Sequence, residues 1–325
     1  MRRTIGALGA LACLVTIAAV SGCSVNQTRH DSSRQRTRIH SLGDVNTPLL
    51  RYFPTAQEDS IVLKARSELT NQCLRHYGLP AQRPLTDPVS DMVRNPLPFY
   101  LSESSASKYG YRAATPKATP ESPQGSISPR VLPPAERKAI DAVMNGWGNL
   151  PKKDALHSFR GRTVSKNGCI GESDARIMAH TTRPRINGGQ KVTDSTQILN
   201  LILTLKSEAT DRLERDPSYT AMIRSWASCV RKLGQPYATP ADARGAAARM
   251  APTASGGPSK KELHLGRQDA FCQQKVNYLG TVGYLTELYQ RDVVNEYRKT
   301  LADVRKNIDQ RVAAARRIND GAPRA

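Results

Sequence analysis

The sequence lacks the short motifs that mark common catalytic and metal sites. It contains no Gly-x-Ser-x-Gly turn, no His-Glu-x-x-His helix, no phosphate loop ending in Gly-Lys-Ser or Gly-Lys-Thr, and no Cys-x-x-Cys pair. Its six histidines are scattered, and we interpret His76, His157 and His180 as surface or helix-capping residues rather than general bases. We therefore expect no catalytic residue, no cofactor and no metal ion in this protein.

Charged residues are missing from Ile5–Val20, which follows two arginines at the start of the chain. This is the layout of a secretory signal peptide, and the run is short for a membrane span, which needs about 20 apolar residues. Ser21 and Gly22 then precede Cys23, and this sequence resembles the lipobox of bacterial lipoproteins. We predict that residues 1–22 are removed and that Cys23 carries a diacylglyceryl group. The alternative is an ordinary signal peptide, or an uncleaved anchor, that happens to end in cysteine.

Acidic residues are scarce along the whole chain. The chain has 48 lysines and arginines but only 28 aspartates and glutamates, a net charge of +20. Loss of residues 1–22, which hold two arginines and no acid, leaves +18. Nucleic acid is the usual partner of so basic a chain, but export argues against that partner.

Much of this positive charge lies in residues 23–55, which we interpret as a basic, flexible tether. Cations beside a membrane anchor are attracted to anionic phospholipid, and an anionic wall polymer would attract them equally. The arginines that we expect to make such contacts are Arg29, Arg34, Arg36 and Arg38. The alternative is a disordered polar spacer without a partner.

Four cysteines are left once Cys13, which is removed with the signal peptide, and Cys23 are set aside: Cys73, Cys169, Cys229 and Cys272. An even number of cysteines in an exported chain predicts disulfides, and four cysteines allow three pairings. A zinc site is the competing interpretation, but the spacing of these cysteines and of the histidines is not that of a zinc motif.

An internal repeat favours one of the three pairings. Residues 73–80 and 229–236 share the pattern Cys, aliphatic, Arg, basic, apolar, Gly, any residue, Pro. Each copy is typical of a helix end, because cations suit the C-terminal dipole, glycine adopts the left-handed position and proline stops the helix. The other two cysteines each begin the next helical pattern. The economical pairing is therefore Cys73–Cys169 and Cys229–Cys272, with each bond joining one helix end to the next helix start.

Helical periodicity runs through most of the chain beyond residue 55. Apolar residues recur every three or four positions in three segments, 58–77, 195–213 and 217–233. We predict a mostly α, disulfide-stapled helical domain over residues 56–318, with irregular Pro-rich insertions, a mobile one among them at 112–132, and a tail at 319–325. Residues 198–205 could instead form a strand, because six of the eight are leucine or isoleucine.

The strongest local pattern lies near the C-terminus. From Leu279 to Val312 apolar residues advance in steps of three and four, and no proline occurs between residues 259 and 322. Nine steps cover 33 residues, a longer mean step than the ~3.5 residues of a two-stranded coiled coil, so we predict a nearly straight helix packed in the domain. A helix of about 50 residues would reach roughly 75 Å, and we expect its far end to project.

Several short segments are more specific in combination than alone: Cys73–Gly78, Lys108–Tyr111, Gly168–Glu172, Trp226–Cys229, Leu233–Gly234 and Tyr284–Tyr289. Over residues 60–310 the combination resembles a group of uncharacterised actinobacterial secreted lipoproteins. The resemblance implies export, lipidation and four framework cysteines, and it implies no active site. Some members of the group resemble accessory proteins of exporters.

A basic, exported chain without catalytic motifs favours a binding protein over an enzyme. Our first hypothesis is a lipoprotein on the outer face of the cell membrane, a helical binding or scaffold protein for an anionic wall polymer, a lipid or a membrane protein. The second is an accessory subunit of a transporter or envelope-stress system that docks through its C-terminal helix. An envelope hydrolase without a short motif is the least favoured interpretation.

Overall fold

The computed structural model is mostly helical, as the sequence predicts. It describes residues 38–81, 95, 97, 99–112, 134–152, 155–186, 189–192 and 194–321. Residues 198–205 lie within a helix, so the alternative of a strand is wrong. The elements are η1 (Leu42–Asp44), η2 (Leu50–Tyr52), α2 (Ala56–His76), α4 (Glu103–Tyr109), α5 (Pro134–Asn145), β1 (Ser158–Phe159), β2 (Arg162–Thr163), α6 (Gly168–Ile177), α7 (Ser195–Glu214), α8 (Pro217–Lys232), α9 (Pro240–Ala248), α10 (Lys260–Lys275), α11 (Tyr278–Glu296) and α12 (Arg298–Asn319).

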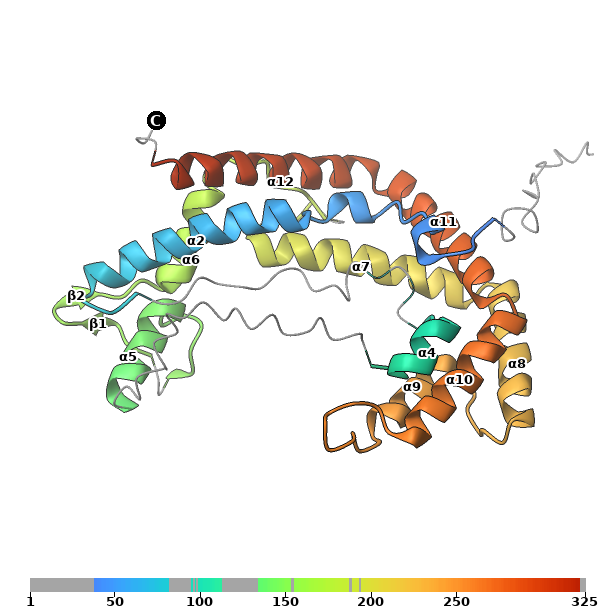
Figure 1. Ribbon diagram of the computed structural model, residues 1–325. Coiled ribbons are helices and arrows are strands. Elements are labelled where there is room, and N and C mark those ends of the chain that lie inside the picture. Colours follow the sequence, from blue (N-terminus) through green and yellow to red (C-terminus); the bar gives the residue numbers. More distant parts are fainter. Residues whose placement is uncertain are drawn as a thin grey trace, which may run out of the picture.

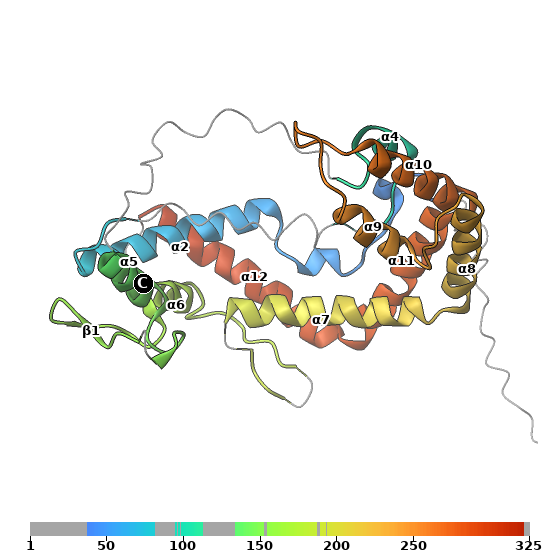
Figure 2. The ribbon, with the colours of Figure 1, turned by 90° about the horizontal axis from the view of Figure 1, so that it is seen from below.

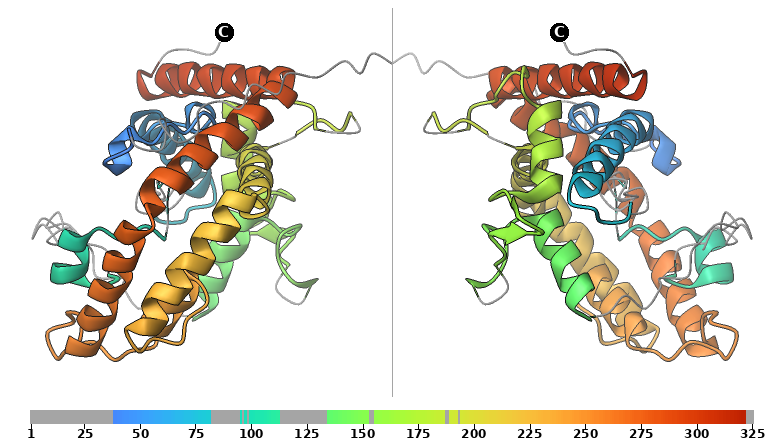
Figure 3. Two further views of the ribbon diagram at one scale, coloured as in Figure 1. Left: turned by 90° about the vertical axis from the view of Figure 1, so that its right-hand side faces the viewer. Right: turned by 90° about the vertical axis from the view of Figure 1, so that its left-hand side faces the viewer.

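Long helices form the body of the molecule, with smaller elements at its two ends. α2, α7 and α12 run lengthwise, α5, α6 and the β1–β2 hairpin lie at one end, and α4, α8, α9 and α10 lie at the other (Figures 1 and 2). α11 leads obliquely from α12 towards α10 (Figure 3). The largest apolar cluster joins the long helices, and Leu69, Ile202 and Ile308 are among its buried members. This cluster therefore holds α2, α7 and α12 in one body.

The internal repeat ends two helices, as predicted. Its glycines adopt the left-handed conformation, with φ of 67° at Gly78 and 81° at Gly234. In both copies the N–H of the residue after the glycine bonds to the carbonyl five residues earlier, at 3.0 Å. This arrangement is a Schellman motif, which satisfies carbonyls at the helix end and reverses the chain. The cysteine of each copy is thus held near a fixed helix end.

Both predicted disulfides are present. Cys73–Cys169 links the last turn of α2 to the start of α6, with Cα atoms 5.6 Å apart, and Cys229–Cys272 links α8 to α10 at 5.7 Å. One detail of the prediction is wrong, because Cys272 lies near the end of α10 and not at a helix start. The helix begins earlier than expected since Ser259 caps it, accepting a hydrogen bond from the N–H of Glu262 at 3.1 Å.

The C-terminal stripe is shared by two helices and does not form one straight helix. α11 ends and α12 begins at Tyr297, and α10 is separated from α11 at Asn277, where φ is 48°. The backbone hydrogen bonds continue through this bend, since Tyr297 N–H bonds to Val293 O and Leu301 N–H bonds to Tyr297 O, both at 2.9 Å. The apolar residues therefore keep their helical spacing across the bend, and the sequence pattern does not indicate it. The far end does not project, since α12 packs along α2 and Val312 is buried.

The tether predicted for residues 23–55 ends earlier than expected. η1 and η2 belong to the folded domain, where Leu49 and Phe53 are almost fully buried. The N–H of Leu49 donates to the side chain of Gln290 on α11 at 3.1 Å. Short 3₁₀ turns carry no 3.6-residue period, which explains why the sequence pattern missed them. The earlier part of the tether and residues 113–132 of the predicted insertion lie outside the described residues.

Candidate ligand pocket between three helices

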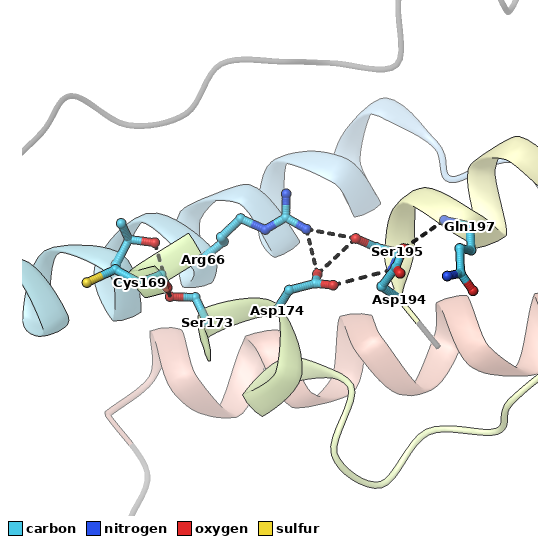
Figure 4. Close-up of polar contacts among 8 residues, drawn as sticks. Arg66, Cys169, Ser173, Asp174, Asp194, Ser195 and Gln197 are labelled. Carbon is cyan, nitrogen blue, oxygen red and sulfur yellow. Dashed lines mark hydrogen bonds and ion pairs between the residues drawn. The ribbon is translucent and has the colours of Figure 1, made fainter. Parts of the chain in front are cut away.

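An arginine, an aspartate and a serine meet where α2, α6 and the start of α7 come together (Figure 4). Nη2 of Arg66 donates to Oδ1 of Asp174 at 2.6 Å and to Oγ of Ser195 at 3.0 Å. Ser195 donates from its own Oγ to Oδ1 of Asp174 at 2.9 Å and from its backbone N–H to Oδ2 at 3.3 Å. The Asp174 carboxylate thereby fixes both the Arg66 guanidinium and the first turn of α7.

Asp174 is held in its ionised form. Burial alone would raise the pKa of this carboxyl, but the guanidinium groups of Arg66 and Arg311 and the hydrogen bonds from Arg66 and Ser195 outweigh burial. The pKa of Asp174 is consequently lower than that of an ordinary aspartate. Arg66 and Asp174 form a largely buried ion pair in which each neutralises the other.

Arg311 is the unusual residue of this region. It lies on the inner face of α12 and is only 9% exposed, and its Nε has no hydrogen-bond partner. Within the described part of the chain no carboxylate forms an ion pair with its guanidinium. Burial lowers the pKa of Arg311, and Asp174 and Asp59 oppose that effect from a distance while Arg66 adds to it. Because arginine stays protonated in proteins, Arg311 is a buried cation without a directly bonded counter-ion.

Arg311 lines a cavity of about 200 Å³ between α2, α7 and α12. The polar part of its lining comes from Asp59, Arg66, Ser195, Thr196 and Arg311. The remaining walls are mostly aliphatic and come from all three helices, with Val62, Leu63, Ile198, Ile202 and Ile308 among them. The cavity therefore combines apolar walls with one cation that lacks a partner.

A larger cavity of about 520 Å³ borders a different face of α7. Leu201 and Leu205 line it from the helix, and Val192 and Tyr297 line it from the opposite side. Of its lining residues in the described structure, Glu208 alone carries a charge, and that carboxylate is paired with Arg212. The rest of its polar lining consists of amide and hydroxyl side chains, and these do not select a ligand by charge.

A second buried carboxylate, Asp269 of α10, has all its partners inside the protein. It accepts hydrogen bonds from Nε1 of Trp226 at 2.9 Å, the hydroxyl of Tyr111 at 2.8 Å and Nε2 of Gln273 at 3.0 Å. Burial raises the pKa of Asp269 despite these bonds. The cluster packs beside Cys229–Cys272, so Trp226 is a core residue and Asp269 is structural.

The predicted contact residues lie mostly outside the described chain. The structure does not describe Cys23, Arg29, Arg34 or Arg36. Arg38 is the first residue that it describes, and this side chain is exposed. No group of three metal-binding side chains comes together in the part of the chain that the structure describes. Nor is any helix described there long and apolar enough to cross a membrane.

Sequence reasoning missed the residues of the Arg311 cavity. The partners of Arg66 come from distant segments, and no local spacing indicates that Asp174 and Ser195 will meet it. Arg311 did leave a signal, because it lies three residues after Ile308 and directly before Val312, inside the apolar stripe of a predicted helix. Arginine is almost never fully buried without a partner, so a cation within such a stripe indicates an interaction that the apolar pattern does not show.

Neither the histidines nor any relative assigns a function. His76, His157 and His180 are all exposed. The chain matches no protein-family model, no curated protein and no solved structure.

Proposed function

We propose that the protein is a cell-envelope lipoprotein, tethered through acyl groups on Cys23, that binds an anionic envelope surface through cationic side chains. The residues Val20–Cys23 support the anchor, and the net charge of +18 after processing supports an anionic partner. The two disulfides indicate an oxidising, extracytoplasmic environment. A domain held at the membrane by acyl chains meets the lipid surface at high local concentration, so we place the partner there.

One structural feature carries this proposal, the outer face of α10. Lys260, His264, Arg267, Phe271 and Lys275 follow one another at spacings of three and four residues, and every one is exposed. Such spacing places them on one side of a helix, which we call the α10 stripe. Phe271 is 47% exposed, and Nζ of Lys275 lies 5.9 Å from the centre of its ring. None of the five positions is acidic.

The α10 stripe suits an anionic lipid surface better than a polar polymer. Each lysine or arginine near an anionic bilayer contributes about 1 kcal/mol to binding, and an aromatic ring gains free energy by entering the headgroup region. A polar polymer would leave Phe271 without an apolar partner. The opposite face of α10 is fixed in the core by Leu265, Asp269 and Cys272, so the stripe stays turned outward.

Vesicle binding tests the proposal. The chain from residue 24 onward, exported behind an ordinary signal peptide so that its disulfides form, is mixed with vesicles of phosphatidylglycerol and phosphatidylcholine or of phosphatidylcholine alone. We expect binding to the anionic vesicles only, weakening as salt is raised. Replacing Lys260, Arg267 and Lys275 with glutamine should weaken binding more than about a hundredfold, since three contributions of about 1 kcal/mol are lost.

The matched control removes three exposed cations from α12, by Lys306→Gln, Arg316→Gln and Arg317→Gln. This variant has the same net charge as the stripe variant. Its binding to anionic vesicles should therefore weaken only by the small amount that the lower overall charge causes. Equal losses in the two variants, or equal binding to neutral and anionic vesicles, would reject the α10 stripe as the contact surface.

A further inference from the structure

We infer that the cavity between α2, α7 and α12 is a binding site for a small carboxylate with a short apolar chain, and that Arg311 binds the carboxylate. The helices that line the cavity, α2, α7 and α12, form the body of the molecule, whereas α10 lies at one end (Figure 1). The inference therefore does not depend on membrane binding by the α10 stripe.

The charge balance of the cavity favours a monoanion. Arg66 is already neutralised by Asp174, so Arg311 supplies the one guanidinium without a directly bonded counter-ion among the described residues of the cavity. Asp59 also lines the cavity, and a dianion would be repelled by both carboxylates while meeting a single unpaired cation. A ligand with one negative charge gives the Arg311 guanidinium a directly bonded counter-ion, and these carboxylates repel it less than they would repel a dianion.

The shape of the donor favours a carboxylate. A guanidinium is a planar fork that gives two parallel N–H bonds to the two oxygens of one carboxylate. Ser195 and Thr196 bring the first turn of α7 to the same cavity. The N–H groups of Gln197 and Ser195 already bind the carboxylates of Asp194 and Asp174, so Arg311 is the group that remains for a ligand anion. Ser195 is itself held by Asp174, so this turn is preformed before a ligand arrives.

The walls and the volume define the rest of the ligand. Ile198, Ile202 and Ile308 surround the cavity with aliphatic surface, which favours an apolar chain. Its volume of about 200 Å³ lies below the ~300–1,000 Å³ of sites for drug-sized ligands. This volume suits a short-chain carboxylate better than an intact two-chain lipid.

Calorimetric titration of the full chain, purified in nonionic detergent, tests the inference with three probes. Hexanoate carries the charge and the chain, hexanol carries the chain alone, and dibutyl phosphate is a monoanionic diester that stands for a lipid phosphodiester. We expect saturable binding of hexanoate and much weaker binding of the other two. Equal affinity for hexanol would overturn the role of charge, and a preference for dibutyl phosphate would overturn the assignment to carboxylates.

Variants connect the binding to Arg311. Arg311→Met should lower the affinity for hexanoate about tenfold or more, because a hydrogen-bonded charge partner is lost. Arg311→Lys keeps the charge without the fork and should give an intermediate affinity. Arg317→Gln removes an exposed cation from the same helix and should leave the affinity nearly unchanged. Unchanged affinity in Arg311→Met would refute the site.

A cavity-filling variant keeps the test decisive if Arg311→Met does not fold. Leu63→Trp retains Arg311 but fills the space beside it, so it should abolish hexanoate binding. Hexanoate binding at full affinity to that variant would show that the ligand binds elsewhere. Binding to anionic vesicles should be the same in both cavity variants and the parent chain, which separates this inference from the proposed function.

Discussion

Trp226 donates its indole N–H to Asp269 across 2.9 Å, and both side chains are almost completely buried. The bond joins α8 to α10 beside the disulfide that links the same two helices. Tyr111 binds the other carboxylate oxygen, so the segment after α4 is attached to the same acid. A buried carboxylate with three hydrogen-bond donors holds this end of the molecule together, yet its charge opposes burial.

Asp269→Asn is therefore expected to change the pH dependence of stability. The pKa of Asp269 is raised by burial, so the folded chain binds this proton more tightly than the unfolded chain does. The stabilising contribution is complete below the pKa of an unfolded aspartate and is lost as pH rises through the raised pKa. The variant lacks this loss, so its free energy of unfolding should rise relative to the parent between acid and neutral pH, as measured by urea titration.

Asp174→Asn provides the control of opposite sign. The pKa of Asp174 is lowered in the folded state, so its contribution is present above the ordinary aspartate pKa and is lost as pH falls through the lowered value. The variant lacks that contribution, and its free energy of unfolding relative to the parent should fall as pH rises. Parallel pH profiles for the two variants would contradict the charge states that we assign.

Each disulfide is expected to contribute substantially to stability. Cys73–Cys169 and Cys229–Cys272 close loops with sequence separations of 96 and 43 residues. Removing either bond by a double alanine substitution should lower the free energy of unfolding by about 2–5 kcal/mol. Chemical unfolding with and without a reductant measures the effect. A variant that lost less than about 1 kcal/mol would show that the helix contacts alone fix that end of the molecule.

Two glycines with similar backbone angles should respond very differently to alanine. Gly168 and Gly161 both have positive φ, 63° and 74°, so each substitution strains the backbone. A Cβ on Gly168 would overlap the backbone of Gly146, whereas a Cβ on Gly161 would meet nothing within 4 Å. Gly161→Ala should cost about 1 kcal/mol and Gly168→Ala several times more, as measured by thermal unfolding. Similar costs would refute the close contact between α5 and α6.

Local features of this fold could be predicted from the sequence because their causes are local. The repeat around Cys73 and Cys229 carries a basic turn, a glycine and a proline, and those residues end a helix whatever surrounds it. The disulfide pairing followed from the same helix ends. The helical stripes were likewise visible, because burial of one helix face leaves a period of 3.6 in the chain.

Features that depend on distant contacts could not be predicted. The bend at Tyr297 keeps its backbone hydrogen bonds, so the apolar period passes through it unchanged. η1 and η2 are ordered by packing, including the bond from Leu49 to Gln290, which is 241 residues away. The Arg66–Asp174–Ser195 junction joins three helices, and the spacing of these residues in the sequence does not indicate that they come into contact.

Cys23→Ala tests the anchor on which the proposed location depends. Each acyl methylene buried in a bilayer contributes about 0.8 kcal/mol, so two or three chains hold a protein on the membrane even in high salt. Cations such as those of the α10 stripe act only electrostatically, and salt screens them. We expect the parent chain to stay with membranes washed in high salt, and the variant to lose its lipid label and be released by the same wash. Retention of an unlabelled variant would show that something other than acylation anchors the protein.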